Sequence, residues 1–585
     1  MRWNAQARAV TVSFGLVGAF SVFSFRLIDL QIAKHEEYTA LAAEKHVHKQ
    51  VIYARRGIIR DVHHEPLAEN VPVKTVVADA SHMRDPIAVA KAVADQLKMD
   101  PQELADKLKT GRKYIVLKRE VSEEAANRLK EALRIANLGG IFFEQDFVRT
   151  YPNGPLLSQV IGFVDHDHKG ALGIERTMQD ILQGANGFRY TEQDRTGKEL
   201  VPYRGLESAG KDGCDVTLTI DLGLQNIVEN ELGRAMDEYK PKGAIAIMVR
   251  PQTGEIMAMA SRPTFDLNNP GGSDADETKN RAVVYMVEPG SVFKIVPVSA
   301  ALNEKLVTPD TTIFCENGHF MYGGRLLRDA EPQGVLTVHG VLQHSSNIGA
   351  AKLGLQLGEN RLYDYARRFG FGQKTGIALT GEIPGLLSPP QHWSKLEITR
   401  IPMGQSVAVT PLQMVMAMAC VANNGKLMKP MIVSQITDPT GRVVATYFPE
   451  VQRQVVTPNT CRKVIPALQD VVAAGTAKSA VVPGFKVAGK TGTAQKIDPK
   501  GGYMSGHYVS SFIGFLPADD PKFVLLVTLD DPTVKGELAF GGRTAAPVFS
   551  QIAARAVSYM DLRPTEPVPP PAGTKKVALA RRGRH

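Results

Sequence analysis

Two groups of apolar, strand-like segments lie far apart in this chain. Residues 244–249 and 256–260 are apolar runs joined by the turn-forming stretch 251–254, which predicts a β-hairpin. Three further strand candidates come close to the C-terminal end: residues 485–487, 511–516 and 523–529. Helix-rich sequence separates the two groups. The simplest arrangement is one sheet built from both ends of a domain, with a helical subdomain inserted between them.

The N-terminus also constrains the chain. Residues 9–25 contain no charged side chain and are mostly apolar, with Arg8 before them and Arg26 after them. Such a run is at the short end for a membrane-spanning helix and longer than the core of a usual signal peptide. We therefore expect residues 9–28 to be an uncleaved transmembrane signal anchor, with residues 1–8 in the cytoplasm. A cleaved signal peptide and a buried helix are the alternatives.

The composition narrows the class of protein. The 585 residues exceed one ordinary domain, and 43% apolar with 22% charged residues is typical of a globular chain. The excess of 69 basic over 60 acidic residues suits an anionic membrane surface or wall polymer. No basic stripe with interleaved aromatic residues indicates nucleic acid. The four cysteines are scattered without C-x-x-C or Cys/His metal-ligand spacing, so the sequence predicts neither a zinc site nor a disulfide framework. We expect no metal and no cofactor.

Polar segments predict how the chain divides into domains. Residues 36–205 mix short apolar runs with charged ones and contain no catalytic constellation, so we expect a non-catalytic module there. The polar stretch 194–213 marks the boundary, and residues 214–560 form the expected catalytic domain. Residues 563–585 are rich in proline and basic side chains and have little to bury, which predicts disorder.

A serine three positions before a lysine occurs twice. Ser208 and Lys211 lie in a polar stretch that is typical of a flexible linker. Ser291, in contrast, opens an apolar run that predicts a helix. Lys294 then lies one turn later on the same face. A serine nucleophile needs a base within hydrogen-bond reach, and a lysine serves when burial and a cationic neighbour lower its pKa. Taken alone, the pattern also fits a surface serine and a solvated lysine.

Ser-x-Asn occurs once, at Ser345 and Asn347, just before a helical run. A hydroxyl and an amide two residues apart can both point into a cleft. Taken alone, the same residues are at least as typical of a helix N-cap.

Lys-Thr-Gly occurs three times, beginning at Lys109, Lys374 and Lys490. The first lies in the expected non-catalytic module, and the second lies in a predicted loop turn. Only Lys490 ends an apolar strand candidate and leads toward two more strands. An edge strand there would offer backbone groups to an extended peptide, and Gly492 would allow a close approach.

Together and in this order, the three motifs resemble those of penicillin-binding proteins and serine β-lactamases. Residues 56–61, Arg-Gly-Ile-Ile-Arg-Asp, resemble the opening of the pedestal domain of the class B members. Further stretches resemble later landmarks of the pedestal and the transpeptidase domain: residues 162–164, 170–175, 218–221, 251–256, 288–291, 371–372, 404–405 and 410–413. The family usually continues its first motif with an Arg-Asn-Gly turn, and residues 61–66 depart from that pattern.

The likeness is to a class B, monofunctional penicillin-binding protein of the division or septum (or spore) type. It implies an α+β fold, in which helices flank the antiparallel sheet of a serine β-lactamase-like transpeptidase domain. A transmembrane helix and an elongated pedestal would precede that domain. The catalytic residues that the resemblance implies are Ser291, Lys294, Ser345, Asn347 and Lys490. Those implied for the substrate and the oxyanion hole are Thr491, Gly492 and Thr493.

The resemblance also implies an activity and partners. The activity is D,D-transpeptidation of peptidoglycan stem peptides that end in D-Ala-D-Ala, with β-lactams as covalent inhibitors. The protein would lie in the bacterial cytoplasmic membrane, with its catalytic domain outside the cytoplasm, beside a polytopic glycosyltransferase and other division proteins. An elongation-type transpeptidase and a D,D-carboxypeptidase are the nearest alternatives. A β-lactamase or β-lactam sensor and a non-catalytic division scaffold are more distant ones.

Overall fold

The computed structural model describes residues 4–37, 47–193, 199–202, 207–498, 500–534 and 536–567. They form two compact units. The first unit holds Met1–Arg56, Asn70–Val148 and Gly184–Gly213, and the second holds Gly57–Glu69, Arg149–Gln183 and Cys214–His585. Two stretches of the expected non-catalytic module, 57–69 and 149–183, therefore pack with the larger unit. Most of the tail expected to be disordered, from residue 568 on, lies outside the described residues.

The first unit begins with helix α1 (Ala5–Ile28). Within the described residues, the stretch Gln6–Ala33 is the one helix that is long and apolar enough to cross a membrane. The other helices and strands of this unit are β1 (Val47–Ile52), β3 (Pro66–Ala78, from Asn70 on), α3 (Pro86–Leu97), α4 (Pro101–Lys109), β4 (Ile115–Val121), α5 (Glu123–Ile135), β5 (Ile141–Thr150, up to Val148), β6 (Gly187–Gln193) and β7 (Glu199–Pro202). Helices α3, α4 and α5 share one apolar core with strands β3 and β4.

The second unit is built around an antiparallel sheet. In the described part of the chain, five strands follow the order β10 (Ile256–Arg262), β9 (Gly243–Val249), β21 (Phe523–Asp530), β20 (Tyr503–Leu516) and β19 (Ala488–Ile497). Strand β19 therefore forms one edge. The expected hairpin and the sheet made from both ends of the domain are confirmed.

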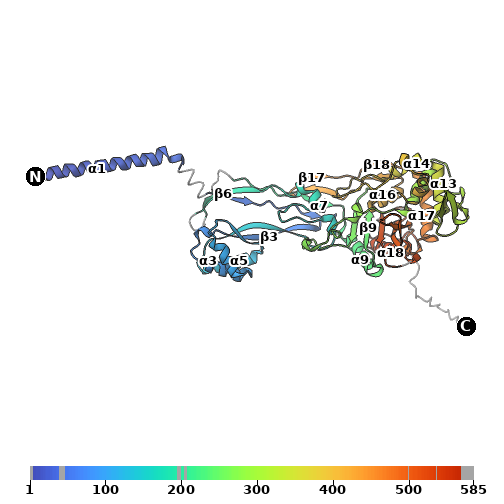
Figure 1. Cartoon of the computed structure of the whole chain (residues 1–585), viewed down its shortest axis with the longest axis horizontal. Coiled ribbons are helices and arrows are strands. Elements are labelled where there is room, and N and C mark those ends of the chain that lie inside the picture. Colours follow the sequence, from blue (N-terminus) through green and yellow to red (C-terminus); the bar gives the residue numbers. More distant parts are fainter. Residues whose placement is uncertain are drawn as a thin grey trace, which may run out of the picture. The chain divides into compact units, whose positions relative to one another are not determined.

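Both faces of this sheet are buried. Along β9, Ala244, Ala246 and Met248 join the core that helices α9 (Leu222–Tyr239) and α18 (Ala545–Tyr559) cover. The alternate residues Ile245 and Ile247 join the larger core formed with the helical insertion. Because successive side chains of a strand point to opposite faces, a strand buried on both sides must be apolar throughout. Figure 1 shows α9 and α18 beside β9.

The insertion between β10 and β19 is mainly helical, as expected. Its helices and strands are α10 (Arg281–Val284), α11 (Ile295–Asn303), β11 (Thr312–Phe314), β12 (His319–Tyr322), β13 (Arg325–Arg328), β14 (Val335–Thr337), α12 (Val338–Gln343), α13 (Asn347–Leu357), α14 (Glu359–Arg368), α15 (Glu397–Arg400), α16 (Pro411–Ala422), β15 (Lys426–Met428), β16 (Val433–Thr437), β17 (Val443–Thr446), β18 (Val451–Gln454) and α17 (Pro458–Ala473). The rest of the unit adds β2 (Ile59–Arg60), α6 (Ser158–Ile161), α7 (Gly173–Thr177), α8 (Gln179–Leu182) and β8 (Asp215–Leu218).

One predicted strand is wrong. Residues 485–487 form no strand; Phe485 pairs in an isolated bridge with Val482, and β19 begins only at Ala488. The side chains of Phe485 and Val487 are buried in the core under α9 and α18, which explains their apolar character without a strand. Strand β19 therefore runs through Lys490 rather than ending before it.

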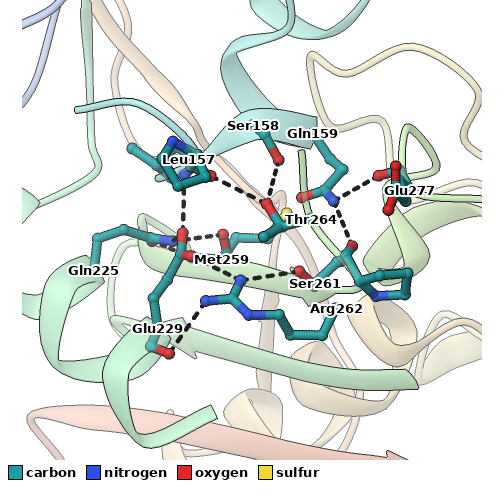
Figure 2. Close-up of polar contacts among 12 residues, drawn as sticks. Leu157, Ser158, Gln159, Gln225, Glu229, Met259, Ser261, Arg262, Thr264 and Glu277 are labelled. Carbon is teal, nitrogen blue, oxygen red and sulfur yellow. Dashed lines mark hydrogen bonds and ion pairs between the residues drawn. The ribbon is translucent and has the colours of Figure 1, made fainter. Parts of the chain in front are cut away.

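A buried polar network joins residues 149–183 to helix α9 and strand β10 (Figure 2). The carboxylate of Glu229 on α9 accepts hydrogen bonds from the backbone N–H of Leu157 and from Gln225 Nε2, both at 2.8 Å. The same carboxylate pairs with Arg262 of β10 at 2.7 Å. Gln225 also bonds the backbone N–H and C=O of Met259, at 2.8 and 2.9 Å. We call Leu157, Gln225, Glu229 and Arg262 the Glu229 junction.

Candidate active site

Ser291 lies in a short 3₁₀ turn, Gly290–Lys294, that continues directly into α11. The turn places Lys294 Nζ 3.0 Å from Ser291 Oγ. Pro297 falls in the first turn of α11, where a backbone N–H has no partner within the helix, so it does not interrupt the helix. The local sequence thus brings a half-buried hydroxyl and a buried amine within hydrogen-bond distance.

Backbone contacts fix this turn in place. Gly290 has a φ of 53°, in the left-handed region, and its N–H donates to the carbonyl of Gly404 at 3.2 Å. A Cβ at Gly404 would lie 2.1 Å from the carbonyl oxygen of Gly290. Both positions therefore need glycine, one for its conformation and the other for close packing.

The three residues of the Ser345–Asn347 stretch make different contacts. Ser346 is the N-cap of α13, and its hydroxyl accepts from the N–H of Gly349 at 2.9 Å. Ser345 stands before the helix with a φ of 59°. Because Ser346 performs the capping, the side chains of Ser345 and Asn347 are available to Lys294. Lys294 Nζ donates to Asn347 Oδ1 at 2.8 Å, to Ser345 Oγ at 3.2 Å and to the backbone carbonyl of Ser345.

Lys490 approaches the same group from strand β19. Its Nζ lies 2.9 Å from Ser345 Oγ, so the Ser345 hydroxyl lies between two lysines. The structure therefore brings together five residues singled out in the sequence: Ser291, Lys294, Ser345, Asn347 and Lys490.

The residues after Lys490 continue along the sheet edge. Thr491 Oγ1 lies 2.9 Å from Thr476 Oγ1, and Thr493 Oγ1 accepts from the N–H of Gly541 at 3.1 Å. A Cβ at Gly492 would lie 3.0 Å from Val292 Cγ2 and 3.1 Å from the carbonyl of Pro289. Gly492 thus allows β19 to pack closely against the turn that carries Ser291. The sequence suggested only a close approach of substrate.

Within the described residues, neither lysine forms the ion pair that a buried charge usually has. Both side chains have 0% exposed surface, and the contacts described above are to hydroxyl, amide and carbonyl oxygens. Burial lowers the pKa of Lys294 to about 7, and the carboxylate of Asp329 opposes this shift. Burial, and then the charge of Lys294, hold the pKa of Lys490 well below its ordinary value. A buried amine that is partly neutral near pH 7 can accept a proton from Ser291.

The other copies of the motifs do not reach this cluster. Lys109 is the last residue of α4 in the first unit, and Lys374 is exposed in the loop after α14. Ser208 and Lys211 form isolated bridges with Phe188 and Ala185, so this stretch is paired rather than a free linker. Within the described residues, no three His, Cys, Asp or Glu side chains gather as metal ligands.

One further residue, which the sequence motifs do not include, lies beside the cluster. Asp329, the residue after β13, accepts hydrogen bonds from Ser346 Oγ at 2.7 Å and from the N–H of Asn347 at 2.5 Å. No motif marked it, since it belongs to an exposed hairpin segment of no distinctive spacing.

Comparison with known proteins places the chain in a family. The model of the penicillin binding protein transpeptidase domain matches residues 244–554, and that of the penicillin-binding protein dimerisation domain matches residues 51–218. Among sequence relatives, stage V sporulation protein D of Bacillus subtilis is 36% identical over 558 residues, covering 94% of this chain and 85% of that protein. Peptidoglycan D,D-transpeptidase FtsI of Escherichia coli is 31% identical over 524 residues, covering 88% and 85%.

Comparison with solved structures supports the same family. Penicillin binding protein 3 of Mycobacterium tuberculosis, complexed with aztreonam, superimposes with a TM-score of 0.69 and 29% identity, covering 89% of this chain and 99% of that one. The chain therefore belongs to the penicillin-binding protein family and has the transpeptidase and dimerisation domains of its class B, division- and spore-type members.

Proposed function

We propose that this protein is a peptidoglycan D,D-transpeptidase of the division or spore type, which cross-links stem peptides through an acyl-enzyme on Ser291. The observation that carries this proposal is the 3.0 Å contact between Ser291 Oγ and the buried amine of Lys294. Two relatives support the proposal: a peptidoglycan D,D-transpeptidase, whose name gives the substrate class, and a sporulation protein.

The first step is acylation of the enzyme. Lys294 takes the proton of Ser291 Oγ, which attacks the carbonyl carbon of the penultimate D-Ala of a stem peptide. The backbone N–H groups of Ser291 and Thr493 stabilise the resulting oxyanion. The bond to the terminal D-Ala then breaks. Its amine receives the proton from Lys294 through Ser345 Oγ, which lies 3.2 Å from Lys294 Nζ.

The terminal carboxylate of the donor peptide is held near Lys490 and the hydroxyls of Thr491 and Thr493. An arriving carboxylate stabilises the charged form of Lys490, which burial otherwise disfavours. A charged Lys490 in turn disfavours charge on Lys294, so substrate binding helps to keep the base neutral. Asn347 holds Lys294 and the amide of the substrate.

The second step transfers the acyl group. An amine from a neighbouring stem peptide attacks the ester carbon, loses its proton to Lys294 and releases Ser291 Oγ, which regains a proton. The open edge of β19 can hold an extended peptide by backbone pairing. A β-lactam imitates the D-Ala-D-Ala end and leaves a stable ester on Ser291.

The remaining regions support a reaction outside the cell membrane. Helix α1 serves as a single transmembrane anchor, with Arg8 on its cytoplasmic side. Residues 36–205 form a pedestal and residues 214–560 the transpeptidase domain. The protein works at the outer face of the cytoplasmic membrane beside a polytopic glycosyltransferase and other division proteins.

Labelled penicillin and peptide mapping test this proposal on the full chain in detergent. We expect the label on Ser291 and no label on Ser291→Ala. Because Lys490 lies at the reacting group, Lys490→Ala should slow acylation about 100-fold. The exposed Lys374, in the same Lys-Thr-Gly sequence, provides the matched control, and Lys374→Ala should leave the rate unchanged. Label that persists on Ser291→Ala, or the reverse result for the two lysines, refutes the assignment.

Product analysis then separates two activities on the same acyl-enzyme. With stem peptide and an added acceptor amine, a transpeptidase yields the cross-linked amide. A carboxypeptidase releases D-Ala and the shortened peptide only.

A further inference from the structure

We propose that Asp329 is a positioning residue for the transpeptidation site, which holds Ser345 and Asn347 against Lys294 from behind. The proposal rests on the proposed function, because the contacts that Asp329 supports belong to the acylation machinery. Among the residues that the structure describes, Asp329 forms no hydrogen bond with Ser291 or Lys294. It acts on them through the segment that joins α12 to α13.

Three hydrogen bonds converge on the Asp329 carboxylate. Oδ2 accepts from Ser346 Oγ at 2.7 Å, and Oδ1 accepts from the N–H groups of Asn347 at 2.5 Å and Ile348 at 3.0 Å. The two N–H groups open helix α13, where a negative charge is favourable. Hydrogen bonds to an ionised carboxylate are shorter and stronger than neutral ones. One side chain therefore fixes both the backbone and the cap of the Ser345–Asn347 stretch.

The preceding residue fixes the amide of Asn347. Asn347 Nδ2 donates to the backbone carbonyl of Arg328 at 2.9 Å. Because a carbonyl can only accept, this bond assigns the NH₂ group to that side and leaves Oδ1 facing Lys294 Nζ, at 2.8 Å. Arg328 and Asp329 thus hold the side chain and the backbone of Asn347 from the end of β13.

Asp329 also sets the charge around the base. Its carboxylate favours the protonated form of Lys294 and so opposes the effect of burial on the pKa of that lysine. The other charged group facing Lys294 is Lys490, across Ser345. Asp329 in turn faces Lys294 and the buried thiol of Cys315, whose other charged neighbour is Lys352. Loss of the Asp329 charge would therefore make Lys294 easier to deprotonate, even though the site around it is less well held.

A purely structural role for Asp329 predicts something different. If the carboxylate only stabilised α13, substitution would lower the melting temperature and leave the pH profile of the folded enzyme unchanged. The near-isosteric change Asp329→Asn keeps an acceptor for the two N–H groups and removes the charge, so it separates these cases. Asp329→Ala removes both the acceptor and the charge.

The experiment measures the acylation rate by fluorescent penicillin from pH 5.5 to 9, on the detergent-solubilised full chain, with a melting curve for each variant. At the high-pH plateau, Asp329→Asn should be about tenfold slower than wild type. Asp329→Ala should be about 100-fold slower, since small misplacements of reacting groups have effects of this size. The acidic limb of the Asp329→Asn profile should move to lower pH. The control is Glu316→Gln. Glu316 also contacts helix α13, because its carboxylate lies 2.6 Å from the amine of Lys352 on that helix. The profile of this variant should match wild type.

A second variant tests the same contact if Asp329→Ala does not fold. Ser346→Ala removes the hydroxyl between Asp329 and the segment, and should slow acylation severalfold. Combined with Asp329→Asn, its effect should be less than additive, because both changes break the same contact. Unchanged plateau rates and an unmoved acidic limb in folded Asp329→Asn, or additive losses in the double variant, overturn the role of Asp329. A wild-type chain that takes no label on Ser291 overturns the proposed function, and this proposal with it.

Discussion

Two buried polar clusters in the larger unit differ in whether their charged side chains are paired. In the Glu229 junction, one carboxylate meets one guanidinium at 2.7 Å, and a backbone N–H and an amide complete its partners. In the active site, two lysines with no exposed surface lie on either side of Ser345 Oγ. The carboxylate that opposes the lowered pKa of Lys294 is Asp329, which bonds α13 instead of either lysine.

The difference shows where this fold gains stability and where it gives up stability for reactivity. A buried charge with a complete set of partners is held in one state, and losing either partner is costly. A buried amine without a counter-ion is easily deprotonated, which a general base requires and which a stable core avoids. Replacing the cation by an apolar side chain of similar length should therefore have opposite effects in the two clusters.

The largest effect is expected for Lys294→Met. Acylation by labelled penicillin should fall by at least about 10⁴-fold, because the proposed base for Ser291 is lost. The apparent melting temperature should stay the same or rise by about 2 °C, because a poorly compensated buried charge is removed. Rate and melting curve are measured on the same preparation.

Lys374→Met is the control for Lys294→Met. Lys374 is exposed, so both its acylation rate and its melting temperature should match wild type. A large loss of stability in Lys294→Met would show that the lysine supports the fold, and the contrast between the clusters would fail.

The next effect concerns Arg262→Met in the Glu229 junction. The change leaves Glu229 buried without its cation, so the free energy of unfolding should fall by about 3 kcal/mol. Acylation by the folded fraction should stay within about threefold of wild type, since in the part of the chain that the structure describes no junction residue bonds the catalytic cluster. Chemical unfolding followed by tryptophan fluorescence measures the loss.

Arg234→Met provides the matched comparison. Arg234 pairs with Glu231 at 2.9 Å, but its side chain is 70% exposed. Arg234 is largely solvated, and the buried carboxylate of Glu231 keeps a second cation, Arg555 at 2.6 Å, so stability should change by less than about 0.5 kcal/mol. An equal loss for both arginines would mean that burial of the Glu229 junction does not matter.

Much of the active site could be predicted from the sequence because its contacts begin locally. Ser291 and Lys294 share one helical turn, and Ser345 and Asn347 flank one helix start. Lys490 was separable from Lys109 and Lys374 because only its copy lies among apolar strands. The sheet built from two distant groups of strands followed from the same apolar pattern.

What the sequence did not reveal depends on contacts between distant segments. Asp329 acts on α13 from the end of another strand, and nothing in its neighbours marks it. Phe485 and Val487 looked like a strand because burial, not pairing, selects their side chains. Likewise, no local signal predicted that residues 149–183 would join the larger unit, since the Glu229 junction that holds them uses three separate segments.

The smallest predicted effect is a difference between the two clusters in how the free energy of unfolding depends on pH. Lys294 has a pKa of about 7 in the folded protein, against about 10.4 for an unperturbed lysine in the unfolded chain. Between these values the unfolded chain binds more protons, so the contribution of Lys294 to stability rises with pH. Lys294→Met lacks this contribution. Its stability relative to wild type should therefore decline by about 2 kcal/mol between pH 7 and 9.

Arg262→Met provides the comparison, because an arginine keeps its proton throughout this range. Its deficit relative to wild type should be the same at pH 7 and 9, measured by the same unfolding experiments in detergent. Lys490 is present in both variants, and burial, the larger cause of its lowered pKa, is the same in each. If the Lys294→Met difference were also independent of pH, Lys294 would keep an ordinary pKa in the folded chain. The buried amine would then be too basic to be neutral near pH 7, and the contrast between a reactive and a stabilising buried charge would be lost.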